Sequence, residues 1–379
     1  MRTIRYVGCG ILLAAALPAQ ITLSSGNLGF TTADPSATSQ LPRSMDLVAD
    51  ALQVDQGFEH WWYFRVAGDT METALRDVGG LASSVSASGE HGDRDFADVD
   101  GRGLLKASLD FDAFSAGPAS GLVISRLTVM NTSPSALTVD LFAYTDVDVA
   151  GSAGDDSCIG SGDSHLISDA SGVQIEVRGV GADGSDVLAY PALRNQLSDT
   201  AVDDLSNALP PFAGDYTGAF QWQRTLQPFE QRTFTVLIAV DTPAIAPPAV
   251  EHYGAGNGSQ FEIFADEMPL QDLVQPRSFG VRMKGALPGA EYRIVTGLDS
   301  WTPLPFIPGI ELWVNPPSII GVYGGLTDAN GEAAEVFGLP TTAYLTGISV
   351  YHQCFYVDAA APNGFAFSTP GMRTTVGKL

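Results

Sequence analysis

Four aspartates are the side chains in this sequence best suited to chemistry. Asp146 and Asp148 are two residues apart in an apolar run, so in a strand they share one face, about 6.6 Å apart. Asp155 and Asp156 follow the glycine-containing bend 151–154. Carboxylate oxygens suit Ca²⁺, which accepts roughly six to eight oxygen ligands in irregular geometry. The pattern therefore predicts a calcium site with Asp146, Asp148, Asp155 and Asp156 as ligands, and no other cofactor is expected.

Two other interpretations of these aspartates stay open at this point. They could form a solvated acidic turn whose carboxylates accept hydrogen bonds from local backbone amides. They could also supply the two carboxyl groups that glycoside hydrolysis needs, at separations of about 5–5.5 Å or 6.5–9.5 Å. Spacing along the sequence does not fix that separation, so the hydrolase interpretation has the least support of the three.

The aromatic run Phe58–Val66 is a second candidate site. Aromatic faces can stack on sugar rings, and on this hypothesis His60, Trp61 and Tyr63 bind a glycan or another cell-surface component. In a strand, however, Trp61 and Tyr63 point to one face while His60 and Trp62 point to the other. A strand between two packed layers has this pattern, so burial in a core is the favoured alternative.

No motif assigns a catalytic mechanism. The sequence has no G-x-S-x-G elbow, no P-loop or dinucleotide fingerprint, and no His/Cys spacing typical of zinc. If the chain is an enzyme, we expect a carbohydrate-active one of mutarotase-like or lyase-like architecture, with His60 or His165 acting beside an acid. The leading hypothesis is instead a non-catalytic binding or structural protein.

The composition predicts strands joined by many turns. The 379 residues include 31 Asp against 12 Glu, only 3 Lys, 41 Gly and 23 Pro. Asp, Gly and Pro favour turns, whereas Glu and Lys favour helices. The formal net charge of −24 repels the phosphates of nucleic acids and anionic membrane surfaces, so neither is an expected partner.

The first 19 residues have the layout of a secretory signal. Arg2 and Arg5 precede an apolar run, and Pro18-Ala19 offers a small-residue cleavage point. The apolar run is shorter than the roughly 20 residues that span a membrane, and no later stretch is apolar enough to do so. We therefore expect a secreted protein, located outside the cell, in the periplasm or on the cell surface, with no membrane span after cleavage.

The sequence divides into two predicted domains. Residues 20–240 read as a large antiparallel β-sandwich of supersandwich-like architecture, and 261–379 as a small immunoglobulin-like β-sandwich. Residues 241–260 carry three prolines followed by three glycines, which predicts a linker. Within the first domain, the period of four in 191–207 predicts a short helical excursion beginning at Pro191, and 91–103 predicts a solvated hairpin connection.

Two cysteines follow the predicted signal, Cys158 and Cys354. They fall in different predicted domains, so a disulfide would have to join the domains. Two separate thiols are the favoured alternative, and no redox role is assigned to either.

Several segments resemble known proteins. TDVDVAGSAGDD (145–156), PFAGDYTGAFQW (211–222) and HWWYFRVAGDT (60–70) are similar to a domain of uncharacterised secreted bacterial proteins. LTDANGEA (326–333) and FYVDAAAPNGFAFS (355–368) resemble a C-terminal β-sandwich module of such proteins. The resemblance implies export and β-architecture. It implies no established activity.

Overall fold

The computed structural model describes residues 21–32, 45–49, 54–80, 83–207, 209, 211–241, 248–258, 261–266, 268–271, 276–307, 310–341 and 345–378. The predicted signal segment lies outside these residues. The chain is 59% strand and 5% helix, which confirms the predicted all-β class. Among the described residues, no helix is both long and apolar enough to cross a membrane.

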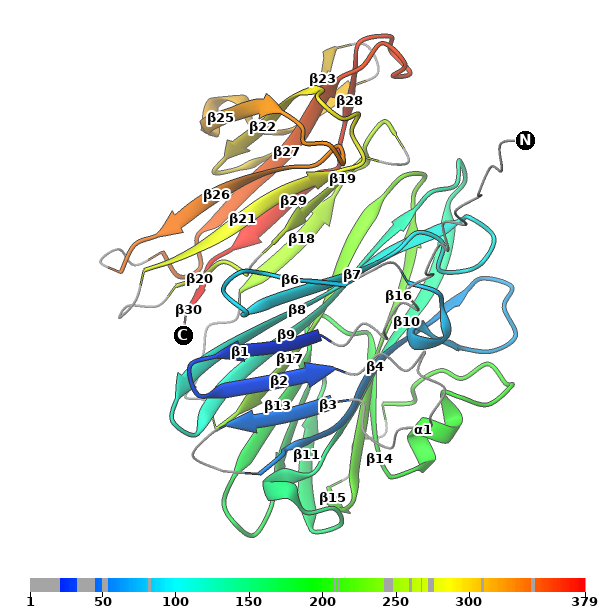
Figure 1. Cartoon of the computed structure of the whole chain (residues 1–379). Helices are drawn as coiled ribbons and strands as arrows, with labels where there is room; N and C mark the ends of the chain where they lie inside the picture. The colour runs from blue at the N-terminus through cyan, green and yellow to red at the C-terminus, as the bar shows by residue number, and fades with distance from the viewer. Residues whose placement is uncertain are drawn as a thin grey trace, which may run out of the picture.

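Two antiparallel sheets form the body of the predicted large domain (Figure 1). The smaller sheet has the order β14-β16-β10-β4-β5, with bounds Gly184–Ala189, Tyr216–Leu226, Leu137–Val147, Gly57–Val66 and Thr73–Ala74. The larger sheet has the order β15-β11-β12-β13-β17-β9-β8-β7-β6. Its bounds are Phe212–Gly214, Asp156–Ser161, Ser164–Ser168, Gln174–Gly179, Gln231–Val240, Ser120–Asn131, Leu105–Gly117, His91–Phe96 and Ser83–Val85.

The two sheets enclose the main core. Trp62 from β4 stacks on Trp222 from β16, with ring centroids 5.4 Å apart, and both indoles are buried. A three-stranded sheet covers part of this core with apolar side chains from β1 (Ile21–Ser25), β2 (Leu28–Thr32) and β3 (Met45–Ala49). This packing of sheet on sheet supports the predicted β-sandwich.

The opposite face of the smaller sheet is covered as well. Trp61 and Tyr63 of β4 pack there with Leu193, Leu197 and Leu205. Helix α1 (Ala192–Gln196) follows a cis peptide bond between Tyr190 and Pro191, and it supplies the first of these leucines. The predicted helical excursion is therefore confirmed only over α1, since residues 198–201 form turns and bends. Because β4 is covered on both faces, its aromatic residues can point in both directions and remain buried.

The C-terminal strands form several smaller sheets. The largest has the order β18-β29-β27-β22-β25, with β28 beside β27; its bounds are Ala249–Tyr253, Gly371–Thr375, Ser349–Val357, Glu291–Gly297, Ile319–Leu326 and Ala366–Ser368. A second has the order β19-β21-β26, over Glu262–Ala265, Arg277–Lys284 and Ala333–Leu339. Two strand pairs complete this part: β20-β30 (Leu270–Gln271, Gly377–Lys378) and β23-β24 (Ser300–Ile307, Ile310–Val314). The immunoglobulin-like layout stays a prediction.

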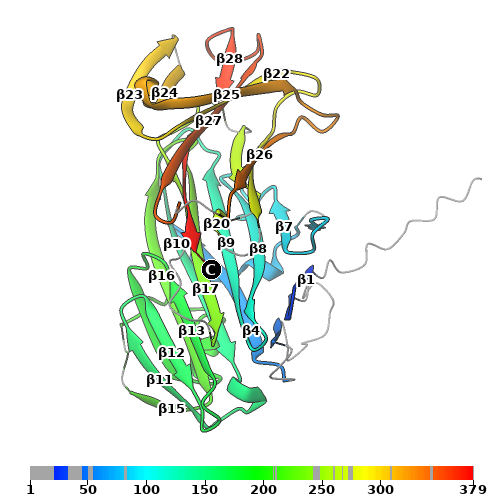
Figure 2. The same cartoon turned by 90° about the vertical axis from the view of Figure 1, so that its left-hand side faces the viewer.

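The predicted linker needs a correction. Residues 249–253 are strand β18, which pairs with β29 in the C-terminal sheet. The three glycines of the segment follow this strand. The division into two domains itself stays a prediction. In both views β23 and β28 lie at the end of the molecule farthest from β11 and β15 (Figures 1 and 2).

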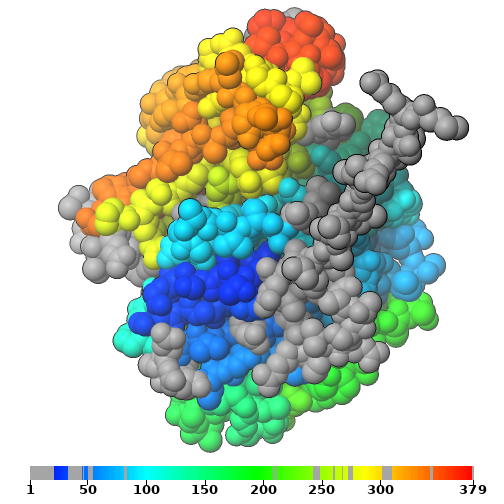
Figure 3. Space-filling view, in the orientation of Figure 1, coloured from blue at the N-terminus to red at the C-terminus, as the bar shows by residue number. Residues whose placement is uncertain are grey.

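The outer face of the large sheet packs against the C-terminal part. An apolar cluster joins Leu122, Ile124 and Leu237 to Ile263 and Val281. The space-filling view shows the yellow and orange C-terminal residues resting on the cyan strands β6 and β7 (Figure 3). The two parts therefore share a buried contact.

One buried arginine crosses this contact. Arg126 of β9 donates to Asp112 Oδ2 (2.8 Å) and, across the contact, to the carbonyl oxygen of Ala265 (2.9 Å). His91 Nδ1 lies 3.0 Å from Asp112 Oδ1 on the other side. The predicted solvated connection is therefore limited to 97–103, which is mostly exposed between β7 and β8, since 91–96 form β7 and His91 is buried. Asp93 and Asp95 of β7 pair with Lys284 across the contact between the parts.

The substitution Arg126→Ala should lower the free energy of unfolding by about 3–5 kcal/mol, because it leaves a buried carboxylate without its cation. Urea denaturation followed by fluorescence measures this. Arg102→Ala is the matched control: Arg102 pairs with Asp100 at 2.8 Å but its side chain is 43% exposed, so a loss within about 1 kcal/mol is expected. Equal losses in the two variants would contradict the structural role of Arg126.

Candidate metal centre

Strand register brings three aspartates to one end of the smaller sheet. Asp146 of β10 pairs with Thr217 of β16 in an antiparallel ladder. Continuing that register by two residues places Asp148 opposite Asp215, just beyond the ends of both strands. Since side chains alternate in direction along a strand, all three carboxylates fall on the same face.

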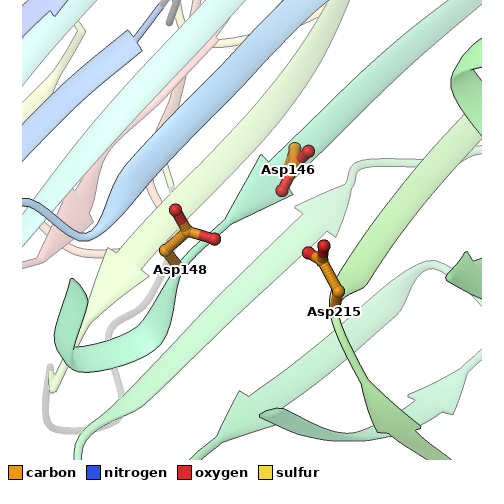
Figure 4. A group of neighbouring side chains, drawn as sticks. All are labelled: Asp146, Asp148 and Asp215. Carbon is orange, nitrogen blue, oxygen red and sulfur yellow. The ribbon is translucent and has the colours of Figure 1, made fainter. Parts of the chain in front are cut away.

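The three carboxylates converge. One oxygen from each of Asp146, Asp148 and Asp215 lies within 4.8 Å of the others. Figure 4 shows the side chains of Asp148 and Asp215 reaching toward each other from two segments, with Asp146 beside them. Two oxygens bound to one Ca²⁺ at roughly 2.3–2.6 Å can be at most about 5.2 Å apart. The separation therefore fits ligation of one ion.

Asp146 is the buried member of this group, while Asp148 and Asp215 are half-buried. Burial, followed by the nearby carboxylates of Asp148, Asp215 and Glu59, raises the pKa of Asp146 from 3.8 to about 8. Its Oδ2 accepts a hydrogen bond from the Tyr144 hydroxyl at 3.3 Å. Its Oδ1 is buried and has no hydrogen-bond partner among the described residues. A buried carboxylate oxygen without a donor is a site for a cation or a proton.

The other two predicted ligands lie outside the group. Asp155 accepts a hydrogen bond from the Ser152 hydroxyl at 2.6 Å, as expected of an acidic turn. Asp156 is buried at the start of β11, and burial raises its pKa to about 7. The structure therefore brings Asp146 and Asp148 together, as predicted. The third carboxylate beside them is that of Asp215, not that of Asp155 or Asp156. The only sequence signal for Asp215 is its place directly before a strand that pairs with β10.

The predicted glycan-binding residues are all buried. His60 lies in the main core, where its Nδ1 is 2.9 Å from Thr145 Oγ1, and burial lowers its pKa to about 4. Trp61 and Tyr63 lie beneath the segment that contains α1. No face of these rings is open to solvent, which corrects the expectation of exposed stacking surfaces and favours the packing alternative.

The second histidine considered for catalysis is also in the core. His165 stacks on Phe220 with ring centroids 4.5 Å apart, and its Nδ1 lies 2.9 Å from the Tyr216 hydroxyl. Burial lowers its pKa to about 4, so the ring is neutral. Cys158 and Cys354 are likewise buried and free, in agreement with two separate thiols.

No family model matches the sequence, and no curated protein matches it. Among solved structures, a bacterial glucoamylase complexed with acarbose aligns with a TM-score of 0.42 and 9% identity over 59% of this chain. That alignment spans 33% of the glucoamylase chain, about a third of its length. A putative aldose 1-epimerase from Escherichia coli K12 aligns with a TM-score of 0.36 and 11% identity, over 59% of this chain and 99% of its own. A GalM/aldose epimerase homologue from C. elegans aligns with a TM-score of 0.38 and 10% identity, over 60% of this chain and 100% of its own. Similarities at this level do not assign an activity to the chain.

The raised pKa of Asp146 predicts a pH dependence for the metal-free protein. Between about pH 4 and pH 8 this carboxyl is protonated in the folded state and ionised in the unfolded state, so the free energy of unfolding falls as the pH rises. Melting temperatures measured in chelator at several pH values test this. Asp146→Asn should flatten the fall, and Asp155→Asn should leave it unchanged. The same slope in wild type and Asp146→Asn would exclude Asp146 as its source.

Proposed function

We propose that the chain is an exported, non-catalytic binding or structural protein whose large domain holds Ca²⁺ with Asp146, Asp148 and Asp215. One observation carries the proposal: three carboxylate oxygens lie within 4.8 Å of one another around a buried aspartate. Such crowding of like charges is unfavourable unless a proton or a cation offsets it.

The chemistry of the donors favours calcium among the metals. The group contains carboxylate oxygens only, whereas zinc sites use mainly nitrogen and sulfur ligands. Mg²⁺ demands near-ideal octahedral geometry, but Ca²⁺ accepts a few protein oxygens completed by carbonyls and water. The role of the ion would be to join the end of β10 to the segment before β16.

Export is supported by the sequence features already described. The basic, apolar and small-residue segments of 1–19 have the order of a secretory signal, and the high negative charge disfavours nucleic acids as partners. The burial of the Trp61 and Trp62 rings and the core positions of His60 and His165 support a non-catalytic role for the large domain.

Calcium should raise the melting temperature in a manner that depends on two aspartates. At about 100 times the Kd, binding to the native state adds about 2.7 kcal/mol, or roughly 5–10 °C for a domain of this size. Differential scanning fluorimetry with calcium and with chelator measures the shift. Asp148→Asn and Asp215→Asn should abolish it.

Asp155→Asn is the matched control, because Asp155 is a nearby acid that lies outside the group and bonds to Ser152. This variant should keep the full calcium shift. A melting temperature that does not respond to chelator in the wild type would overturn the proposal. If the calcium-dependent rise in melting temperature is lost in Asp155→Asn and kept in Asp215→Asn, the calcium site lies in the 152–156 loop and not at Asp215.

A carbohydrate-active enzyme is the second candidate, and one observation favours it. Glu59 lies directly opposite Asp146 in the β4–β10 ladder, where facing side chains are about 4.5–5.5 Å apart at Cβ. Glu59 is held by Arg76 at 2.9 Å and Arg194 at 3.3 Å. Asp146, with a pKa of about 8, could donate a proton at neutral pH. A pair of carboxyl groups, one of them protonated, is the arrangement that glycoside chemistry uses.

The enzyme candidate predicts turnover that depends on Glu59. Incubation with oligosaccharides, followed by reducing-sugar release, and polarimetry of fresh aldose solutions for mutarotation provide the readouts. Glu59→Gln and Asp146→Asn should each lower a measured rate by about two orders of magnitude or more. No activity in the wild type, together with an intact calcium shift, would leave the non-catalytic proposal standing alone.

A further inference from the structure

A cavity of about 490 Å³ lies between the large domain and β18, where the two parts of the chain meet. We call it the seam cleft and define it by six of its lining residues: Trp222, Arg224, Arg232, Tyr253, Tyr351 and Arg373. They come from β16, β17, β18, β27 and β29. The volume is that of small-molecule sites, which form preferentially between domains. We propose that the seam cleft binds a neutral oligosaccharide.

Each arginine of the cleft is held by its own carboxylate. Arg232 Nε pairs with Glu230 at 2.7 Å, Arg224 pairs with Asp183, and Arg373 pairs with Glu251. The positive and negative charges around the cleft therefore balance, on a chain with a net charge of −24.

These pairs place donors and acceptors at fixed positions around the opening. A guanidinium that binds one carboxylate retains further N–H groups, and the carboxylates retain lone pairs. The Nε–H of Arg373 is buried and has no hydrogen-bond partner among the described residues. The vicinal hydroxyls of a sugar both donate and accept hydrogen bonds, so they can pair with these N–H groups and carboxylate oxygens.

Two tyrosines form an aromatic wall. Tyr253 and Tyr351 are half-buried and meet edge to face, with ring centroids 6.0 Å apart. Tyr253 packs in the same way on Trp313, at 6.1 Å, which fixes its orientation. A rigid aromatic surface beside polar groups suits the apolar C–H face of a sugar ring.

The charge arrangement excludes other classes of ligand. A nucleic acid or an acidic polysaccharide would meet the net negative charge of the protein and arginines that are already paired. A metal cation would be repelled by three guanidinium groups. A lipid tail would remove these charged groups from water without replacing their hydrogen bonds. A neutral ligand rich in hydroxyl groups leaves every ion pair of the cleft intact.

The inference does not depend on the calcium proposal. Residues Trp222 and Arg224 lie near the end of β16 opposite to Asp215 and Thr217. Asp148→Asn should therefore leave sugar binding unchanged, so a failed calcium proposal and a failed cleft proposal give different results.

The test uses the full chain on an array of neutral gluco-, manno-, xylo- and galacto-oligosaccharides, with uronate-containing oligosaccharides on the same array. Hits are titrated while tryptophan fluorescence is recorded, because Trp222 lines the cleft. We expect binding to a neutral oligosaccharide and a Kd at least about tenfold higher in Arg373→Gln and Tyr351→Ala. Arg232→Gln tests the cleft in the same way. Because the Arg232 side chain is 41% exposed, this substitution should change the folding stability little.

Arg293→Gln is the matched control, because Arg293 forms a similar exposed pair with Glu291 on β22, outside the cleft. It should bind like the wild type. No binding to any neutral oligosaccharide up to about 10 mM would overturn the inference. So would binding only to uronate-containing oligosaccharides, or an unchanged Kd in both Arg373→Gln and Arg232→Gln.

Discussion

The pairing of β10 with its two neighbours is the constraint on which the large domain depends. Its register with β16 sets Asp148 opposite Asp215, and its register with β4 sets Asp146 opposite Glu59. A shift of β10 by one residue would turn Asp146 and Asp148 toward the main core and away from Asp215 and Glu59. The hydrophobic residues that hold the register, such as Phe142 and Tyr144, are therefore as important to the candidate centre as the aspartates themselves.

The same sheet explains why the aromatic strand is not a binding surface. Trp62 faces the main core and stacks on Trp222, while Trp61 faces the layer that contains α1. Large rings on both faces stabilise the sheet only if both faces are covered. Burial also keeps His60 and His165 neutral and separates them from solvent, so the polar chemistry of the large domain is displaced to the ends of its strands.

The contact between the two parts of the chain creates the second place where chemistry could occur. Arg126 and the apolar cluster around Ile124 attach the C-terminal strands to the outer face of the large sheet. With the two parts attached in this way, β18 runs beside β17 and the seam cleft is enclosed between them. A site at such a contact is lined by residues far apart in the sequence. Arg224 and Arg373, which both line the seam cleft, are an example.

The sequence alone determined the β class, the sandwich packing and the pairing of Asp146 with Asp148, because alternation and turn composition are local properties. It favoured, without deciding, a strand covered on both faces over an exposed aromatic surface for 58–66. Only the tertiary structure decided that the carboxylate of Asp215, and not those of Asp155 and Asp156, converges with Asp146 and Asp148, that β18 begins within the predicted linker, and that His91 is buried. Each of these depends on which strands become neighbours and with what register. That choice is made by long-range packing, which no local pattern records.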